Sequence, residues 1–166
     1  MAQKILLAYG TMAGSTAEVA QAIAEELTQA GAQVDVAPVE SVEDLSGYDA
    51  VVVGTAVRKF RILGKTKRFL RKHRDHLSQV PVAYYLVCLV MREELPENIE
   101  KATQFAKPML ETQEPVSLGL FGGCIRHEKM TDPSGRVLRF LPEQDHRDWD
   151  KIRAWAREIY PLLLNA

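Results

Sequence analysis

The chain has 166 residues, of which 46% are hydrophobic and 26% are charged, and its formal net charge is −1. This length and composition are typical of one globular domain with a single core, and they exclude a disordered or fibrous chain. The N-terminal apolar run, residues 5–8, is too short for a signal peptide or a membrane span. We therefore expect one domain over residues 1–166, a cytoplasmic location and no transmembrane segment.

The first third of the sequence predicts a strand, a helix and a second strand. Residues 4–9 are almost all apolar, which is typical of a strand covered on both faces in a parallel sheet. From Ser15 to Ala30, apolar side chains recur every four residues, as on the buried face of a helix, and Gly31 follows as a stop signal. Residues 34–39 read as the next strand.

The same alternation continues to the C-terminus. Further strands are predicted at residues 49–56, 82–90 and 116–121, and helices at residues 63–77, 96–110 and 144–164. Residues 40–48 connect the second and third strands. Five strands separated by helices predict an open, doubly wound α/β fold with a parallel sheet, because right-handed crossovers place helices on both faces.

In this architecture, ligands bind beyond the carboxyl ends of the strands, at the point where the strand order reverses. Four predicted loops lie at those ends. They are residues 10–16, 55–64, 91–97 and 122–132. A ligand site is expected among them.

The first of these loops has the composition of a phosphate-binding turn. Its small and hydroxyl-bearing residues let N–H and O–H groups converge on an anion at the helix N-terminus. It lacks the Gly-Lys-Ser/Thr ending of nucleoside triphosphatases and the Gly-x-Gly-x-x-Gly turn of dinucleotide-binding proteins, which excludes both classes. Since the loop has no Lys or Arg, neutral donors would hold the phosphate. The alternative is a plain helix cap without a ligand.

Positive charge is concentrated in the middle of the chain, where residues 50–74 carry nine Lys and Arg and no acidic residue. We expect the basic segment 58–74 to dock an acidic redox partner protein or an anionic membrane surface. For its helical part, the alternative is a solvated face with Leu63, Phe69 and Leu70 turned inward. Nucleic acid is not expected as a partner, because stacking aromatics are not interleaved with the charges.

The remaining candidate reactive groups are assigned to packing. Cys88 and Cys124 fall on the fourth and fifth predicted strands, which favours buried, unreactive thiols over a redox pair. Tyr84 and Tyr85 are interpreted as sheet packing rather than as a substrate site. The spacing of residues suggests neither a metal site nor a Ser/His/Asp set or carboxylate pair, so no catalytic residue is assigned.

Several segments along the chain resemble the flavodoxin family. The similar segments are residues 48–58, 82–90 and 121–126, together with Asp148-Trp149 before the last helix. The loop after the first strand also matches the family pattern Thr/Ser-x-x-Gly-x-Thr at Thr11, Gly14 and Thr16. The chain is most similar to the branch that includes the menaquinone-dependent protoporphyrinogen IX dehydrogenases. The resemblance implies a flavodoxin-like sheet with strand order 2-1-3-4-5.

This resemblance implies FMN as the cofactor. Its phosphate would lie on the loop after the first strand, and its ring between the loop at residues 56–60 and the loop that follows Val90. The implied binding residues are Thr11, Met12, Ala13, Gly14, Ser15, Thr16, Ala56, Val57, Arg58, Lys59, Phe60, Val90, Met91, Arg92 and Gly123.

Three features depart from the family pattern. Ala13 stands where flavodoxins usually carry threonine, and Phe60 is the only aromatic candidate for stacking on the ring. We therefore expect weaker FMN binding. The connection from Arg126 to Trp149 is shorter than in the porphyrinogen dehydrogenases and lacks their basic, aromatic-rich and methionine-rich insertion, so the substrate is not carried over.

The expected function is that of an oxidoreductase that transfers electrons between FMN and a small or membrane-soluble partner, such as a porphyrinogen or a quinone. Two alternatives stay open: an electron carrier without its own substrate, and a flavin-free interaction module that kept the fold. Arg58, Lys59 and Arg61 fall on the ring loop. Their charge should favour the anionic reduced flavin and raise the two-electron potential above that of an acidic flavodoxin.

Overall fold

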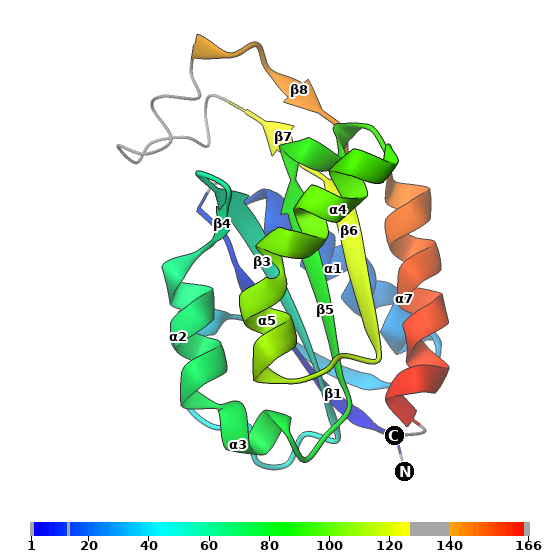
Figure 1. The fold of residues 1–166 in the computed structure, drawn as a ribbon. Helices are drawn as coiled ribbons and strands as arrows, with labels where there is room; N and C mark the ends of the chain where they lie inside the picture. Colours follow the sequence, from blue (N-terminus) through cyan, green and yellow to red (C-terminus); the bar gives the residue numbers. More distant parts are fainter. Residues whose placement is uncertain (1, 13, 127–139, 165–166) are drawn as a thin grey trace.

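The structure is a computed structural model that describes residues 2–12, 14–126 and 140–164. Five parallel strands run through its centre in the order β2-β1-β3-β5-β6 (Figure 1). They are β1 (Lys4–Gly10), β2 (Gln33–Pro38), β3 (Ala50–Arg58), β5 (Val82–Cys88) and β6 (Ser117–Gly122). Counted along the chain this is the order 2-1-3-4-5, so the predicted doubly wound sheet is confirmed.

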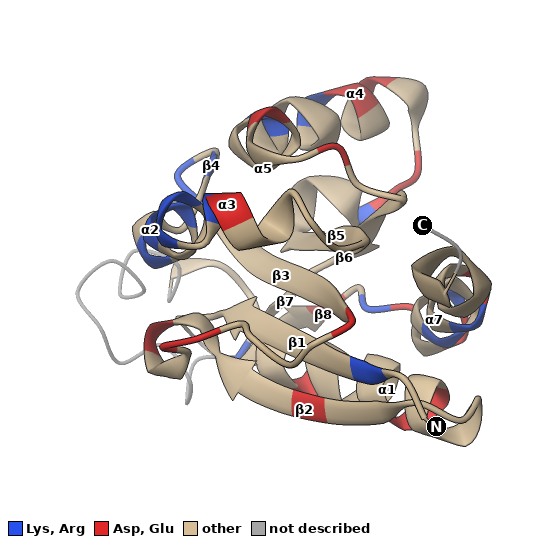
Figure 2. Ribbon diagram, turned by 90° about the horizontal axis from the view of Figure 1, so that it is seen from below, with Lys and Arg blue, Asp and Glu red and all other residues tan. Residues whose placement is uncertain are grey.

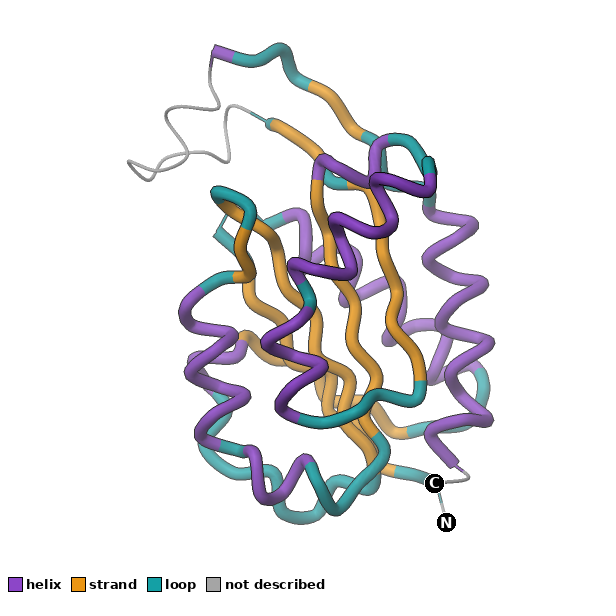
Figure 3. Tube along the Cα trace, viewed as in Figure 1, coloured by secondary structure: helices purple, strands orange, loops and turns teal. Residues whose placement is uncertain are grey.

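Helices cover both faces of the sheet (Figures 1 and 3). They are α1 (Ser15–Gln29), α2 (Gly64–Lys72), α3 (Arg74–Leu77), α4 (Pro96–Phe105), α5 (Lys107–Thr112) and α7 (Trp149–Leu164), with the short 3-10 helices η1 (Val39–Ser41) and η2 (Leu89–Arg92). Within the described ranges, no helix combines the length and the hydropathy needed to cross a bilayer.

Two hydrophobic cores lie on opposite faces of the sheet. Leu7 and Val52 belong to the core beneath α1 and α7, whereas their neighbours Leu6 and Val51 belong to the core beneath α2 and α5. Side chains alternate across a strand, so a strand that is buried on both faces needs apolar residues at every position. This explains the uninterrupted apolar runs in the sequence.

Two of the predicted helices are divided, and one predicted strand is shorter. The helix predicted at residues 63–77 breaks at His73, whose φ of −106° and ψ of 15° leave the helical region. The helix predicted at residues 96–110 divides at Ala106, and Pro108 in the first turn of α5 lacks the N–H that a continuous helix would use. The fourth strand ends at Cys88, because the chain then turns into η2.

The last helix begins at Trp149, five residues later than predicted. Residues 144–145 instead form β8 (Gln144–Asp145), which pairs antiparallel with β7 (Cys124–Ile125) in a short ribbon beyond the main sheet. Cys124 was predicted on the fifth strand and lies in this ribbon. Residues 127–139, which include most of the predicted loop 122–132, lie outside the described residues.

A tight hairpin extends the third strand past its predicted end at Ala56. β3 continues to Arg58 and pairs antiparallel with β4 (Arg61–Ile62), which we call the β3–β4 hairpin. The two turn residues, Lys59 and Phe60, have φ of 51° and 62°. Positive φ at both positions is the requirement of a type I′ turn, which usually selects Asn or Gly.

Tyr85 joins the sheet to both helices of one face. Its ring is fully buried, and a Cβ atom on Gly54 of the neighbouring strand would lie 1.8 Å from the ring Cζ. The hydroxyl donates a hydrogen bond to the carbonyl oxygen of Thr16 over 3.3 Å, in the first turn of α1. The ring also meets Trp155 of α7 edge-on, at 6.0 Å between centroids. The interpretation of Tyr85 as packing is confirmed.

Replacing Gly54 by alanine should destabilise the protein by about 1–3 kcal/mol, because an added methyl group would displace the Tyr85 ring from a close-packed core. The measurement is the free energy of unfolding in a denaturant titration. Gly64→Ala is the control, since a Cβ there would make only ordinary contact, at 3.7 Å from a flexible Arg68 atom. Equal stability of the two variants would contradict this account of Tyr85.

Candidate functional site

The carboxyl ends of β1 and β3 meet at the switch point of the sheet. Gly10 and Thr55 are register partners there, and β1 is flanked by β2 on its other side. The connections from β1 and β3 leave toward opposite faces, which opens a crevice between the loops that follow these strands. Both loops were predicted to carry the ligand.

A buried hydroxyl pair forms the base of this crevice. The Oγ1 atoms of Thr55 and Thr66 lie 2.9 Å apart, and both residues are fully buried. A Cβ atom on Gly10 would lie 2.2 Å from the Thr66 oxygen, so only glycine leaves room for this contact. The start of α2 is thereby fixed against the end of β1, directly before the phosphate loop.

The phosphate loop and the first turn of α1 contain a buried hydroxyl without a hydrogen-bond partner in the described part of the chain. The backbone N–H of Gly14 donates to Thr11 Oγ1 over 2.8 Å, and Gly14 adopts the left-handed φ of 87° that suits glycine. No side chain caps the first turn of α1. Thr16 is fully buried, and its Oγ1 has no hydrogen-bond partner among the described residues. These groups are suited to binding an anion. Ala13 lies outside the described residues.

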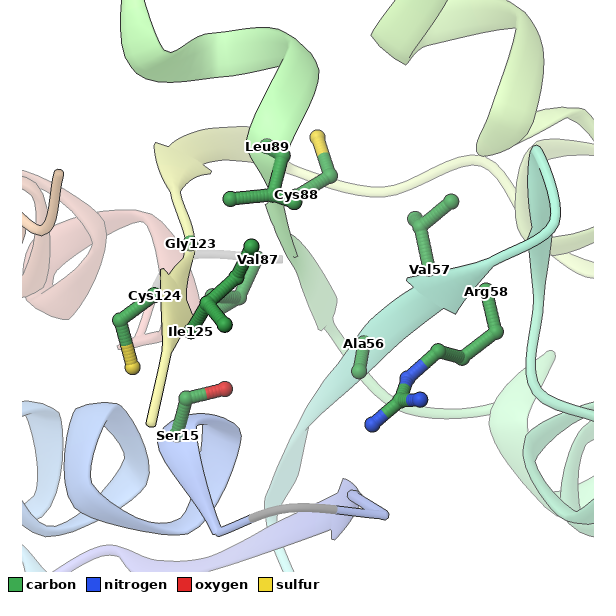
Figure 4. Close-up of a pocket in the computed structure, with 10 residues that line it drawn as sticks. All are labelled: Ser15, Ala56, Val57, Arg58, Val87, Cys88, Leu89, Gly123, Cys124 and Ile125. Atoms are coloured by element: carbon green, nitrogen blue, oxygen red, sulfur yellow. The ribbon is translucent and has the colours of Figure 1, made fainter. Parts of the chain in front are cut away.

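A cavity adjoins the start of α1, and four segments line it (Figure 4). The lining residues are Ser15, Ala56, Val57, Arg58, Val87, Cys88, Leu89, Gly123, Cys124 and Ile125. Its enclosed volume is about 50 Å³. A pocket that encloses a drug-sized ligand measures roughly 300–1,000 Å³. The cavity is therefore too small to enclose a flavin by itself.

Arg58 brings positive charge into this cavity. One of its guanidinium nitrogens, Nη1, is buried and has no partner within the described part of the chain. Figure 4 shows the guanidinium turned back into the cavity, on the side of Ser15, rather than outward along the hairpin. A buried N–H donor without a partner costs free energy, so an anion or a carbonyl group in the cavity would offset that cost.

The other predicted ring contacts lie outside the cavity lining. Lys59 and Phe60 form the tip of the hairpin, and Phe60 is 76% exposed, with its ring 6.2 Å from that of Phe105. The remaining three lie in η2, where Met91 is buried against the core. That set is Val90, Met91 and Arg92. A ring contact for these residues stays a prediction.

Five residues that line the cavity were not assigned from the sequence. They are Val87, Cys88, Leu89, Cys124 and Ile125. Gly123 joins the two segments that contain them, because its N–H donates to the Cys88 carbonyl over 3.0 Å. Val87 and Cys88 end a buried strand and Leu89 begins η2, in an apolar run that gives no sign of a site. The other two lie in a loop that the sequence did mark, although only Gly123 was singled out.

Burial makes both cysteines poor nucleophiles. It raises the pKa of the Cys88 thiol to about 11 and also raises that of Cys124. The thiolate is the reactive form, so both thiols are mostly protonated and unreactive near neutral pH. The two residues are free cysteines that line the same cavity. The prediction of a buried thiol is confirmed for Cys88, whereas Cys124 is only half-buried.

Glu18 anchors the β7–β8 ribbon over the start of α1. Its carboxylate accepts hydrogen bonds from Arg126 after β7 and from Arg147 after β8. Arg147 is 4% exposed, also pairs with Asp145 over 2.7 Å, and lies over the ring of Trp149. Because the ribbon carries Cys124 and Ile125, these ion pairs hold one wall of the cavity in place.

These ion pairs also shift the titration of the carboxylates. Burial alone would raise the pKa of Glu18, but the hydrogen bonds from Arg126 and Arg147 outweigh it and lower the pKa below the ordinary 4.5. The Arg147 hydrogen bonds likewise lower the pKa of Asp145 below 3.8. A lowered folded-state pKa stabilises the fold above the ordinary value, and this contribution is lost as the pH falls through the lowered one.

Glu18→Gln should reduce the free energy of unfolding by about 1 kcal/mol near neutral pH, a value discounted for the 42% exposure of the Glu18 side chain. The difference from the wild type should shrink as the pH falls below 4.5. Chemical denaturation at a series of pH values measures both. Glu43→Gln on an exposed loop is the control. A difference that is constant with pH would refute the role of the Glu18 charge.

Comparison with known proteins identifies a family, sequence relatives and solved structures that this chain resembles. The family model described as "Flavodoxin domain" matches residues 6–144. Protoporphyrinogen IX dehydrogenase [quinone] of Escherichia coli K12 is 28% identical over 96% of each chain, and that of Leishmania major is 22% identical over 97% of this chain and 76% of its own. Among solved structures, a flavodoxin from the domain Archaea superimposes with a TM-score of 0.61 at 17% identity, covering 98% of this chain and all of that one.

Proposed function

The chain belongs to the flavodoxin domain family, and from this we propose that it is an FMN-dependent oxidoreductase whose electron donor or acceptor is a quinone or a porphyrinogen. The observation that carries the proposal is the cavity beside the phosphate loop. A buried Arg58 nitrogen in its lining and the buried Thr16 hydroxyl in the adjoining turn of α1 both lack partners among the described residues. The full-length similarity to quinone-dependent dehydrogenases supports the choice of substrate class.

The phosphate of FMN would be held by the first turn of α1. The backbone N–H groups of that turn are without a side-chain cap, and the hydroxyl groups of Thr16 and Ser15 lie in the same turn. Together with the positive end of the helix they supply the donors that a dianion needs. The Thr11 hydroxyl already accepts a hydrogen bond from Gly14, and its own proton is free for donation.

The flavin ring would lie at the cavity opening, between the β3–β4 hairpin and the segment that joins β5 to η2. The bound flavin supplies the electron and hydride chemistry. The protein orients it, and the apolar side chains of Val57, Leu89 and Ile125 exclude water from one side. Arg58 contributes a positive charge that favours a negatively charged reduced ring.

Thr16→Val should weaken FMN binding about 10- to 150-fold, which corresponds to the loss of one hydrogen bond to a charged group, about 1.5–3 kcal/mol. Riboflavin, which has no phosphate, should bind both proteins equally. Quenching of flavin fluorescence measures both affinities. Thr28→Val is the matched control on the same helix, since its hydroxyl only donates to the Ala24 carbonyl. A parallel loss of riboflavin affinity would place the phosphate elsewhere.

Arg58→Gln should lower the two-electron reduction potential of the bound flavin by about 30 mV, the equivalent of about 1.4 kcal/mol for removal of one nearby charge. Potentiometry in the presence of excess FMN measures this shift. Arg61→Gln removes a charge from the same hairpin outside the cavity lining, and it should change the potential less. Equal shifts in the two variants would show that Arg58 acts only through the overall positive charge of the hairpin and not through its position in the cavity.

The substrate class is tested by FMN titration followed by turnover. The holoprotein should oxidise protoporphyrinogen anaerobically with a soluble menaquinone analogue as acceptor. Turnover that requires a reductase and an acceptor protein would instead identify an electron carrier. A protein that takes up no FMN even at high concentration would be a flavin-free module, and the proposal would be wrong.

A further inference from the structure

A groove separates α2 and the β3–β4 hairpin from α5 on the face opposite to α1 and α7. It consists of two open cavities of about 380 Å³ and 350 Å³ that share the lining residues Lys67, Pro108 and Glu111. The first cavity runs between α2 and α5, and the second continues to the hairpin. We call this continuous surface the α2–α5 groove.

Positive side chains dominate the groove. Its cations are Arg61, Lys67, Arg71, Arg74 and Lys107, and its acidic residue is Glu111. Glu111 lies 3.8 Å from Lys107, so its charge is already matched by one cation. The other four cations have no ion-pair partner in the described part of the chain. Figure 2 shows the same concentration of Lys and Arg along α2.

The inward face of α2 is apolar. Leu63, Phe69 and Leu70 are buried, as predicted, and Leu70 also borders the groove. Lys65, which does not line the groove, pairs with Glu40 over 3.2 Å. Arg68 and Lys72 also lie outside the groove and have no ion pair in the described part of the chain, so what distinguishes the groove cations is that they line a recess. Unmatched cations in a recess concentrate the local positive potential and favour an anionic ligand.

An aromatic pair, of which Phe60 is exposed and Phe105 is half-buried, borders one end of the groove. Phe60 lines it at the hairpin tip and lies beside Phe105 of α4. Phe60 and Lys59 both keep a left-handed backbone that disfavours side chains larger than glycine, a conformation that costs of order 1 kcal/mol per residue. Such strain is concentrated at functional positions, and here it holds an aromatic ring in solvent next to the cations.

The hairpin connects the groove to the candidate flavin site. Val57 and Arg58 of β3 line the cavity beside the phosphate loop, whereas Phe60 to Ile62 line the groove. An occupant of the groove would therefore be separated from the flavin by the β3–β4 hairpin. This is the position that a partner needs when electrons pass between two proteins.

We propose that the α2–α5 groove docks an acidic segment of a partner protein, with Asp or Glu side chains on the cations and an apolar side chain on Phe60. A segment fits better than a bilayer, because the charges lie in a recess between two helices that protruding side chains can enter. The redox role of this partner rests on the proposed function, but the binding itself does not require flavin.

The test measures binding of a fluorescein-labelled decapeptide of glutamate with one central leucine, by anisotropy at low and at physiological salt. The double variant Lys67→Glu/Arg71→Glu should bind at least about tenfold more weakly. The control Arg68→Glu/Lys72→Glu changes the net charge equally, on the same helix, at exposed positions outside the groove. It should lose no more than about threefold.

Three outcomes would overturn the proposal. These are absence of peptide binding at low salt, equal losses in the two double variants, and binding only to vesicles of mixed phosphatidylglycerol and phosphatidylcholine. Lys67→Gln/Arg71→Gln supplies a milder variant if charge reversal prevents folding, which circular dichroism detects. FMN affinity is measured on the same proteins and should be unchanged. A negative peptide result would therefore leave the flavin proposal intact, and failure to bind FMN would leave the docking proposal intact.

Discussion

The buried ring of Tyr85 is the contact on which the geometry of the candidate site depends. It lies in the space that Gly54 leaves open in the neighbouring strand, and its hydroxyl reaches the carbonyl oxygen of Thr16. The first turn of α1 is therefore positioned from below, by the sheet, and not by a capping side chain. This arrangement leaves the upper side of that turn, with its N–H groups, open to an anion.

The β3–β4 hairpin borders both the cavity and the α2–α5 groove. Its inner side carries Arg58 into the cavity, and its outer side carries Phe60 and Arg61 into the α2–α5 groove. Two residues with positive φ make the turn this tight. A longer or looser connection would separate the two sides, so the strained turn is what keeps the cavity and the groove only one strand pair apart.

Local patterns in the sequence predict the sheet and the phosphate loop, and long-range contacts decide the rest. The apolar run at residues 50–56 and the small residues after Gly10 act over a few positions, so they can be read directly. The hairpin turn places Lys59 and Phe60 where turn statistics would expect Asn or Gly.

The β7–β8 ribbon depends on contacts between residues that are far apart in the sequence. Its strands are two residues each, too short for any periodicity, and Glu18 holds them from more than a hundred residues away. Cys124 and Ile125 enter the cavity through this ribbon. Their place in the site therefore follows from an ion pair that no local pattern could have indicated.

The pairing of charges across the fold explains how a nearly neutral chain carries a strongly basic surface. Acidic residues of α1 are matched by arginines near the C-terminus: Glu18 by Arg126 and Arg147, and Glu26 by Arg153 and Arg157. These pairs join α1 to the ribbon and to α7. They also neutralise acidic residues of α1, on the face of the sheet opposite to α2. Of the cations at residues 50–74, only Lys65 has an ion-pair partner among the described residues, so a net charge near zero conceals a separation that the fold itself produces.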